Sequence, residues 1–331
     1  KEEIEEIMAY PEDSAGTMMA TDVFTLYKNT TCRQALKTLQ HHKDAKMVFY
    51  IYIIDDDNSL VGITSLRALA TTHPETKLKE IMVKKVHKVR PETDQEEVAQ
   101  LVAQYNYLAV PVVDSDNILL GIVTVDNVVD VIREEATEDF LKMAGAGKDR
   151  EILLKSSWDS AKIRIPWLLA SWGGGIIASY IIGNFESILE NTIVLVSFIP
   201  IIIGMGGNIG TQSSTIIVRG MATGRITIGN EGIIILKELK IGLILGLLYG
   251  LMLGLFAGLR FLDTEPIIGV VVGLSICSSM IIATGLGTLT PLVLRKLEID
   301  PAVATGPFVT TSIDILGVLL YFLIAGLLLQ V

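Results

Sequence analysis

The sequence predicts a multidomain protein with an α+β first half built from a tandem repeat, then a connecting helix and an all-α transmembrane domain of five helices. Three observations lead to this prediction: an uneven distribution of charge, five long apolar stretches and an internal repeat. Residues 1–160 carry 18 basic and 28 acidic side chains, whereas residues 161–331 carry nine of each and hold 24 of the 29 glycines. Such a split indicates that the two halves meet different solvents.

Composition excludes several classes of function. The acidic first half argues against nucleic acid as a partner, because binding to phosphates needs a basic surface. The two cysteines, Cys32 and Cys277, lie in different halves and cannot build a disulfide framework or a zinc site. The sequence GxxxxGK[ST] is absent, which argues against a primary pump driven by nucleotide hydrolysis.

Five stretches of the second half are long and apolar enough to cross a membrane. Each reaches the roughly 20 residues that a spanning helix needs, and a helix satisfies its own backbone hydrogen bonds in lipid. The stretches cover residues 165–185, 191–218, 241–259, 266–294 and 301–331, the last interrupted by one charge. We therefore expect five membrane helices in contact with lipid.

The basic residues between these stretches predict the orientation. Nine of them fall on one side of the membrane, and only Arg260 falls on the other. Because basic residues concentrate on the cytoplasmic side, the first half should lie in the cytoplasm and Val331 outside. We expect a multi-pass protein of the plasma (inner) membrane.

Glycines in the third stretch recur every four residues and draw a groove along one helical face, which we interpret as a helix-packing surface. They are Gly242, Gly246, Gly250, Gly254 and Gly258. The second stretch contains GMGGNIGTQSST over residues 204–215. Here Gly206 and Gly207 should loosen the helix, and Asn208 brings an amide to membrane depth. This pattern favours a water-filled pathway over hydrogen bonding between helices.

Asp314 is the strongest single signal in the membrane half. It follows 13 uncharged residues and precedes 17 more. An ionised carboxylate exposed to lipid costs on the order of a few kcal/mol, so Asp314 should face the interior of the bundle or an aqueous cavity. No base lies at matching depth. The alternative is a protonated acid bonded to a neighbouring helix, but an unpaired acid favours a cation pathway.

Residues before Asp314 add further oxygen ligands. Gly306 and Pro307 should interrupt the helix and free carbonyl oxygens, while Thr310 and Thr311 supply hydroxyls. Hydroxyl, carbonyl and carboxylate oxygens suit magnesium and calcium, and magnesium keeps most of its waters. The pattern predicts a pathway for a hard divalent cation.

The first half contains two copies of one module, residues 18–70 and 81–133. Met19 matches Met82, and Gly62-Ile63 matches Gly121-Ile122. Each copy predicts the order β-α-β-β-α. The expected helices cover 31–40 and 94–105, and the expected strands cover 48–54, 60–64, 108–113 and 118–124.

An acidic run begins in the last helix of the second copy and continues beyond it. Asp126, Asp130, Glu134 and Glu138 recur every four positions and would form one ridge if residues 126–143 are helical. Like charges at that spacing repel by a few tenths of a kcal/mol per pair. A solvated face is the alternative, but the position between the repeat and the membrane half favours a sensor of divalent cations. A second acidic cluster contains Glu96.

The tandem repeat resembles a pair of CBS domains, regulatory modules that often bind adenine nucleotides. The turns Ser65–Ala68 and Thr124–Asn127 stand where that family usually has Ser/Thr-x-x-Asp, whose aspartate holds the ribose. Here the last residues are alanine and asparagine, a departure that weakens the expected grip on ribose. If ATP binds, the resemblance makes Tyr50, Arg67 and Tyr107 the candidates to contact it.

The whole chain resembles the MgtE family of magnesium channels. The matching strings are EATEDFL at 135–141, GGNIGTQ at 206–212 and DPAVATGPFVTTSID at 300–314. The resemblance implies this organisation: the end of a helical N-terminal domain at 1–16, CBS domains at 17–76 and 77–133, a connecting (plug) helix at 134–160, and a five-span channel domain at 161–331.

The resemblance also implies a function, which is not that of an enzyme. Members of this family are homodimers with a pore on the two-fold axis, where Asp314 would hold magnesium through its waters. Asn208, Gly306, Pro307 and Thr310 would lie near that path. Magnesium bound in the cytoplasm would favour the closed state. The sensor candidates carried over are Glu96, Asp130, Glu135, Glu138, Asp139 and Asp300.

Two alternatives remain open from the sequence. A secondary transporter could exchange a divalent cation for sodium or protons, with Asp314 as the coupling acid. A membrane-anchored, nucleotide-sensing CBS protein would transport nothing.

Overall fold

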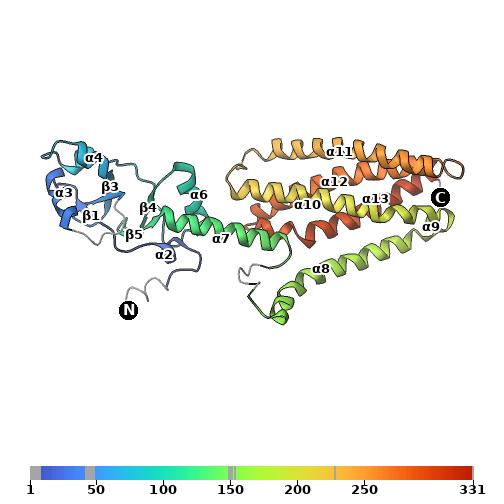
Figure 1. Ribbon diagram of the computed structural model, residues 1–331, viewed down its shortest axis with the longest axis horizontal. Coiled ribbons are helices and arrows are strands. Elements are labelled where there is room, and N and C mark those ends of the chain that lie inside the picture. Colours follow the sequence, from blue (N-terminus) through green and yellow to red (C-terminus); the bar gives the residue numbers. More distant parts are fainter. Residues whose placement is uncertain (1–8, 42–48, 148–151, 153, 227–228, 330–331) are drawn as a thin grey trace. The chain divides into compact units, whose positions relative to one another are not determined.

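The computed structural model describes residues 9–41, 49–147, 152, 154–226 and 229–329 (Figure 1). The chain divides into two compact units, Lys1–Glu135 and Ala136–Val331. The boundary falls within the helix α7 (Val125–Met143). The first unit mixes strands and helices, and the described part of the second is helical, as the predicted fold class requires.

The part of the first unit that the structure describes contains two small sheets. In the first sheet β1 (Thr25–Tyr27) is parallel to β2 (Tyr50–Ile54), which is antiparallel to β3 (Leu60–Ser65). In the second sheet β4 (Ala109–Val113) is antiparallel to β5 (Leu119–Thr124). The helices of this unit before α7 are α2 (Ala15–Met18), α3 (Cys32–His41), α4 (Leu66–Thr71), α5 (Leu78–Ile81) and α6 (Gln95–Tyr105). The predicted β-α-β-β-α order is therefore confirmed in the first copy. In the second copy the described residues show the helix, two strands and final helix, but the first strand is reduced to an isolated parallel bridge between Val89 and Val112.

The two copies complete each other's sheets. A Cβ atom added to Gly62 would lie 2.8 Å from the Sδ atom of Met82, and one added to Gly121 would lie 2.9 Å from that of Met19. The start of each copy thus packs against the second sheet strand of the other, which explains why methionine and glycine both recur in the repeat. Separating the two copies would therefore expose β3 in the first sheet and β5 in the second.

Among the described residues of the second unit, five helices are long and apolar enough to cross a membrane. Its elements are α8 (Ser157–Asn184), α9 (Glu186–Asn191), η1 (Ile193–Phe198), α10 (Ile199–Ala222), α11 (Glu231–Arg260), α12 (Ile267–Lys296), η2 (Pro301–Ala304) and α13 (Pro307–Leu329). The predicted number of spans is confirmed; the second combines η1 with α10. The C-terminal Val331 lies outside the described residues.

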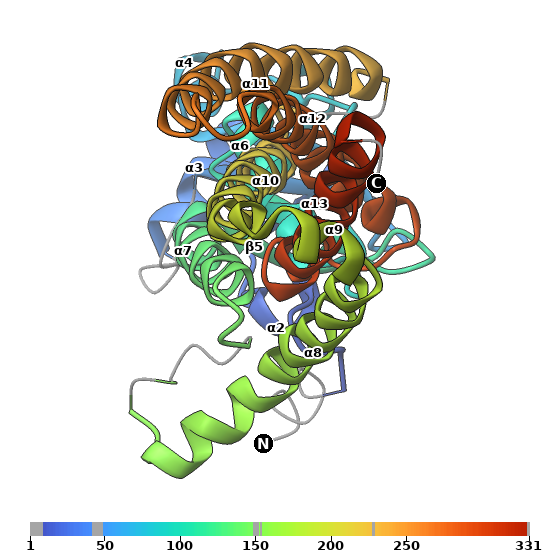
Figure 2. The same ribbon diagram turned by 90° about the vertical axis from the view of Figure 1, so that its right-hand side faces the viewer.

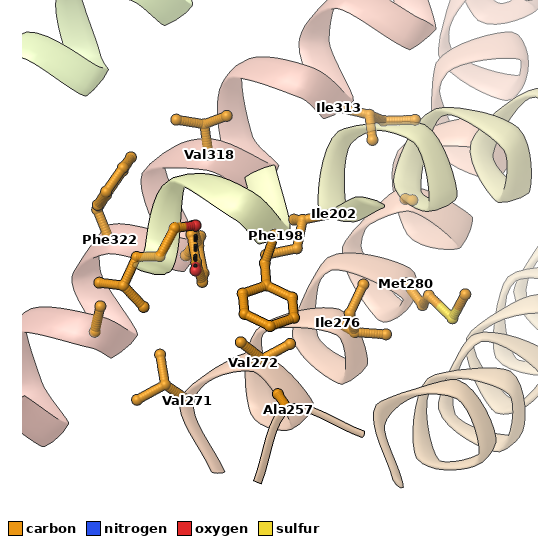
Figure 3. Packing of buried hydrophobic residues seen from close by; sticks show 14 of the residues in the cluster. Phe198, Ile202, Ala257, Val271, Val272, Ile276, Met280, Ile313, Val318 and Phe322 are labelled. Atoms are coloured by element: carbon orange, nitrogen blue, oxygen red, sulfur yellow. Dashed lines mark hydrogen bonds between the residues drawn. The ribbon is translucent and has the colours of Figure 1, made fainter. Parts of the chain in front are cut away.

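Helices α10, α12 and α13 form the centre of the membrane unit. Phe198, Ile202, Ile276, Ile313 and Phe322 pack together there and are nearly inaccessible to solvent (Figure 3). The buried hydroxyl of Tyr321 donates a hydrogen bond of 2.8 Å to the Leu195 carbonyl. Helix α11 packs mainly on α12, whereas α8 packs mainly on α13 and lies at the edge of the bundle (Figures 1 and 2).

The glycine repeat of α11 is a packing surface, as its spacing predicts. A Cβ atom on Gly246 would lie 2.9 Å from the Cys277 carbonyl oxygen of α12, and one on Gly250 would lie 2.6 Å from that of Gly273. The backbone of α12 fills the space that side chains at these positions would occupy. Contact of this kind brings two membrane helices to close range and is common where small residues repeat.

The structure corrects two expectations about glycine in the membrane half. Helix α10 is continuous from Ile199 to Ala222, so Gly206 and Gly207 do not loosen it. A Cβ on Gly206 would lie 2.9 Å from the Ser279 hydroxyl oxygen, so this glycine serves helix packing. Gly306 and Pro307 do not interrupt a helix either, because α13 begins at Pro307. Proline is well tolerated at a first helical position, where its missing N–H would have no partner.

The connecting helix is shorter than expected. The sequence predicts a helix over 134–160, but α7 ends at Met143 and α8 begins at Ser157. Gly145 has φ of 68°, and the amides of Gly145 and Ala146 donate back to the carbonyls of Lys142 and Leu141. This is the hydrogen-bond pattern of a Schellman motif, which stops a helix at a left-handed glycine.

We predict that Gly250→Ala destabilises the membrane unit, because the new methyl group meets the Gly273 carbonyl at 2.6 Å. Overpacking of this kind typically costs about 1–3 kcal/mol. The matched control is Gly232→Ala in the same helix, where a Cβ atom meets nothing within 4 Å. Melting temperatures measured in detergent by fluorescence-detected size exclusion should fall for Gly250→Ala alone, and equal values for the two variants would contradict the packing argument.

Candidate functional site

Asp314 lies two turns into α13 and is half-buried. A Cβ atom added to Gly207 of α10 would lie 3.7 Å from its Oδ1 atom, so the carboxylate faces the backbone of α10. Within the part of the chain that the structure describes, Asp314 forms no ion pair. The lack of a side chain at Gly207 leaves room beside the acid, and the acid has no neighbouring base to neutralise it.

The polar residues of α10 divide between two faces. Ser213 and Ser214 are buried, and the Ser214 hydroxyl donates to that of Thr305 at 3.0 Å. Asn208 and Gln212, one turn apart, are exposed. An exposed amide in a membrane helix requires water or another protein surface, because lipid offers no hydrogen bonds. Asn208 directly follows Gly207, so the exposed amide and the Asp314 carboxylate lie beside the same stretch of α10.

The other predicted pathway residues have different neighbours. The Thr310 hydroxyl donates to the Pro307 carbonyl at 3.3 Å within its own helix. The methyl group of Thr311 lies against Gly174 of α8, so Thr311 belongs to the contact between those two helices. A Cβ on Gly306 would lie 3.4 Å from the Met143 carbonyl at the end of α7. Gly306 and Pro307 therefore join the connecting helix to the start of the helix that carries Asp314.

Three of the predicted sensor residues meet at the end of α7. The Lys142 ammonium lies 2.7 Å from a carboxylate oxygen of Glu138 and forms a second ion pair with Asp300. Asp300 also accepts a hydrogen bond of 2.8 Å from the Ala302 amide and so caps η2. Asp139 lies beside this group, and its burial, together with the charge of Asp300, raises the pKa of its carboxyl above the usual value.

Lys142 could not be recognised from the sequence. A single basic residue in an acidic helix is usually the i,i+4 partner of a neighbouring acid on the same surface. Burial acts to lower the pKa of Lys142, but its hydrogen bonds to Asp300 and Glu138 outweigh that effect and raise the pKa. The lysine therefore stays charged at neutral pH. It pairs with two carboxylates that the sequence assigned to a divalent cation.

The remaining sensor candidates lie elsewhere. Glu135 accepts a hydrogen bond of 2.6 Å from Gln95 of α6. Glu96 accepts one of 3.1 Å from Gln100. The other three, Asp126, Asp130 and Glu134, lie on the exposed side of α7. Among the described residues, no three Asp, Glu, His or Cys side chains are gathered closely enough to hold a metal ion.

Of the three nucleotide candidates, Tyr107 belongs to an aromatic group with His87 and Tyr105 in the first unit. The Tyr107 hydroxyl lies 2.5 Å from Nδ1 of His87, and its ring stacks on Tyr105 at a centroid distance of 5.5 Å. Partial burial and the neighbouring Tyr105 and Tyr50 raise the pKa of Tyr107. Arg67 is exposed on α4.

Glu238 of α11 is a buried acid that the sequence did not single out. Only 6% of it is exposed, and its carboxylate accepts a hydrogen bond of 2.8 Å from the buried Ser213 hydroxyl of α10. The flanking Lys237 and Lys240 make this segment look like the polar end of a span. A buried carboxylate needs such a donor, because ionised groups lose their hydration on burial.

Comparison with known proteins places this geometry in a family. The model of the MgtE family, described as a divalent cation transporter, matches residues 199–324, and the CBS domain model matches residues 15–72 and 78–134. The magnesium transporter MgtE of Thermus thermophilus is 38% identical over 331 residues, which cover 99% of this chain and 73% of the relative. This chain belongs to the MgtE family.

Other members give the same picture. The magnesium transporter MgtE of Enterococcus faecalis is 38% identical over 98% of this chain and 71% of its own length. A crystal structure of the cytosolic domain of the Mg2+ channel MgtE in complex with ATP is 43% identical, with a TM-score of 0.39. That match covers 39% of this chain and about half (53%) of the crystallised one. MgtE proteins are membrane transporters and not enzymes, so the prediction that this chain is not an enzyme is confirmed.

We predict that Ser213→Ala destabilises the membrane unit, because it leaves the buried Glu238 without its hydroxyl donor. An unsatisfied buried polar group costs about 1–3 kcal/mol. Adding Glu238→Gln to Ser213→Ala should restore part of the loss, since an amide is cheaper to bury than a carboxylate. The control is Ser312→Ala, whose hydroxyl bonds within its own helix. Equal melting temperatures for Ser213→Ala and the control would show that the pair contributes nothing.

Proposed function

We propose that this MgtE-family protein is a magnesium channel whose ion pathway passes Asp314. One observation carries the proposal: a carboxylate without a base among the described residues lies beside a glycine of α10, next to an exposed amide. A hydrated Mg2+ can bind such a carboxylate through its waters, since magnesium sheds them reluctantly. The family relatives named as magnesium transporters support the choice of ion.

We further propose a homodimer with the pathway between the two copies. In one chain, Asn208 and Gln212 are exposed on α10, and α8 buries little of its surface apart from its contact with α13. Exposed amides at membrane depth are tolerated where they line water or meet protein. A second copy would cover this face and bring a second Asp314 to the pathway, so that two carboxylates balance one divalent ion.

Gating is proposed to depend on cytoplasmic Mg2+. The end of α7 contacts the residues that precede α13, so a cation bound near α7 acts close to the start of the pathway helix. Glu138, Asp139 and Asp300 are the central candidates there. Ions that bind the closed form more tightly than the open form shift the population by that difference in affinity.

The orientation follows from the positive-inside rule, with the CBS pair and α7 in the cytoplasm and the end of α13 outside. The plasma (inner) membrane is the proposed location, and the membrane potential would then drive Mg2+ inward. Binding of ATP to the CBS pair is a secondary proposal. The stacked rings of Tyr105 and Tyr107 support it, while Asn127 stands where a ribose-binding aspartate is usual and already accepts a hydrogen bond of 2.5 Å from Thr124.

We predict that Asp314→Ala abolishes Mg2+ uptake into liposomes, because the hydrated ion loses the carboxylate proposed to bind it in the pathway. Uptake by the wild type should continue with Mg2+ as the sole permeant cation. Asp314→Asn keeps the shape of the side chain and should lose at least about tenfold in rate, which corresponds to about 1.4 kcal/mol. The control is Thr311→Ser, which keeps a hydroxyl at a neighbouring position that contacts α8.

Two outcomes would redirect the assignment. Strict dependence of uptake on a sodium or proton gradient would favour a coupled exchanger with Asp314 as the coupling acid. Unchanged uptake in Asp314→Ala would contradict both transport mechanisms and favour a membrane-anchored nucleotide sensor.

A further inference from the structure

Lys142 lies between carboxylates at the joint of α7 and the membrane unit. Its ammonium pairs with Glu138 at 2.7 Å and with Asp300, and only 16% of the Lys142 side chain is exposed. Glu138 comes from α7 and Asp300 from the N-cap of η2. One protein cation thus bridges two elements that are 158 positions apart in sequence.

This bridge lies at the start of the pathway helix. Carbonyl oxygens of Lys142 and Met143 would lie 3.5 Å and 3.4 Å from a Cβ atom on Gly306, immediately before α13. Met143 also packs against a cluster that includes the buried Met221 of α10 and Leu292 of α12. The end of α7 therefore packs against the membrane helices. The ion pairs that Lys142 forms with Glu138 and Asp300 are part of this contact.

The charges of the joint are nearly balanced. Glu138, Asp139 and Asp300 contribute three negative charges, while Lys142 and the nearby Arg219 contribute two positive ones. A divalent cation that joined Glu138 to Asp300 would meet the ammonium in the same place. Repulsion between the ammonium and a divalent cation only a few ångströms away opposes binding of the cation. The cation can bind well only after the lysine moves, and its flexible four-carbon stem allows that movement.

We propose that Lys142 is a tethered competitor that sets the Mg2+ concentration at which the channel closes. The inference rests on the proposed Mg2+ sensor and adds how its threshold is fixed. In low Mg2+ the ammonium occupies Glu138 and Asp300. As Mg2+ rises, the ion displaces the ammonium and bridges the same carboxylates with a double charge. The affinity of the joint for Mg2+ is thus lower than its carboxylates alone would give.

The test compares Lys142→Met and Lys142→Gln with Lys142→Arg in the full-length protein. Inhibition of Mg2+ current by internal Mg2+ is measured in patches, and protection of the segment after α7 from protease is measured in parallel. Loss of the ammonium should lower the half-maximal Mg2+ concentration by about fivefold or more in both readouts, as removal of a nearby like charge predicts. Lys142→Arg keeps the charge and should stay within about twofold of the wild type.

The outcomes separate this inference from the proposed sensor. If internal Mg2+ inhibits the wild type but the thresholds of Lys142→Met and Lys142→Gln are unchanged or higher, tethered competition is overturned and the sensor stands. If the wild type is not inhibited, or if Glu135, Glu138 and Asp139 can all be replaced by Ala without loss of inhibition, the sensor itself fails and the competition with it. A lower threshold in both neutral variants, with Lys142→Arg near the wild type, supports the inference.

Discussion

An acidic side chain inside a membrane helix sets the main constraint on this protein. Asp314 needs water, a cation or hydrogen bonds, because lipid supplies none of these. The structure leaves room for the first two by placing the backbone of Gly207 beside the carboxylate. The exposed Asn208 follows on the same helix. The arrangement makes sense only if this face of α10 is shielded from lipid, which is the physical reason for proposing a second copy.

Close backbone contact holds the surrounding helices in place. Glycines of α10 and α11 approach neighbouring helices at points where any side chain would collide, while Tyr321 and Ser213 form hydrogen bonds with groups on other elements. Glycines of α10 at the helix contacts and bulky side chains in the core together hold α10 and α13 close to each other. The start of α13 and Asp314 lie on one continuous helix, so a change at that start acts on the element that carries the acid. The contact between α7 and Gly306 lies at that start, which connects the proposed sensor to the proposed pathway.

Much of the fold could be predicted from the sequence, because each part carries a periodic signal. The repeat predicted β2 with β4 and α3 with α6, and uncharged stretches predicted the five spans. The exchange of Met19 and Met82 between copies was not predictable, since an alignment of repeats shows equivalence and not which copy makes the contact. The glycines of α10 misled the prediction, because glycine weakens a helix in water but serves packing between helices in a membrane.

The candidate site was predictable only in part. Asp314 stands out because a charge in an apolar run is rare, whereas Glu238 is hidden between two lysines at the end of a span. Lys142 gains its importance from Asp300, which is far away in sequence and reaches it only through the fold. Residues whose partners are distant give no local pattern, so their roles required the structure.

The most direct test of the account asks whether the exposed face of α10 lines the ion pathway. Asn208→Cys would be made in a chain whose Cys32 and Cys277 are replaced by Ser, and labelled with a charged thiol reagent during Mg2+ flux. The account predicts that labelling blocks flux and that high Mg2+ slows the labelling. Ser213→Cys, on the buried face beside Glu238, should react far more slowly. Complete labelling of Asn208→Cys with undiminished flux would contradict the central claim.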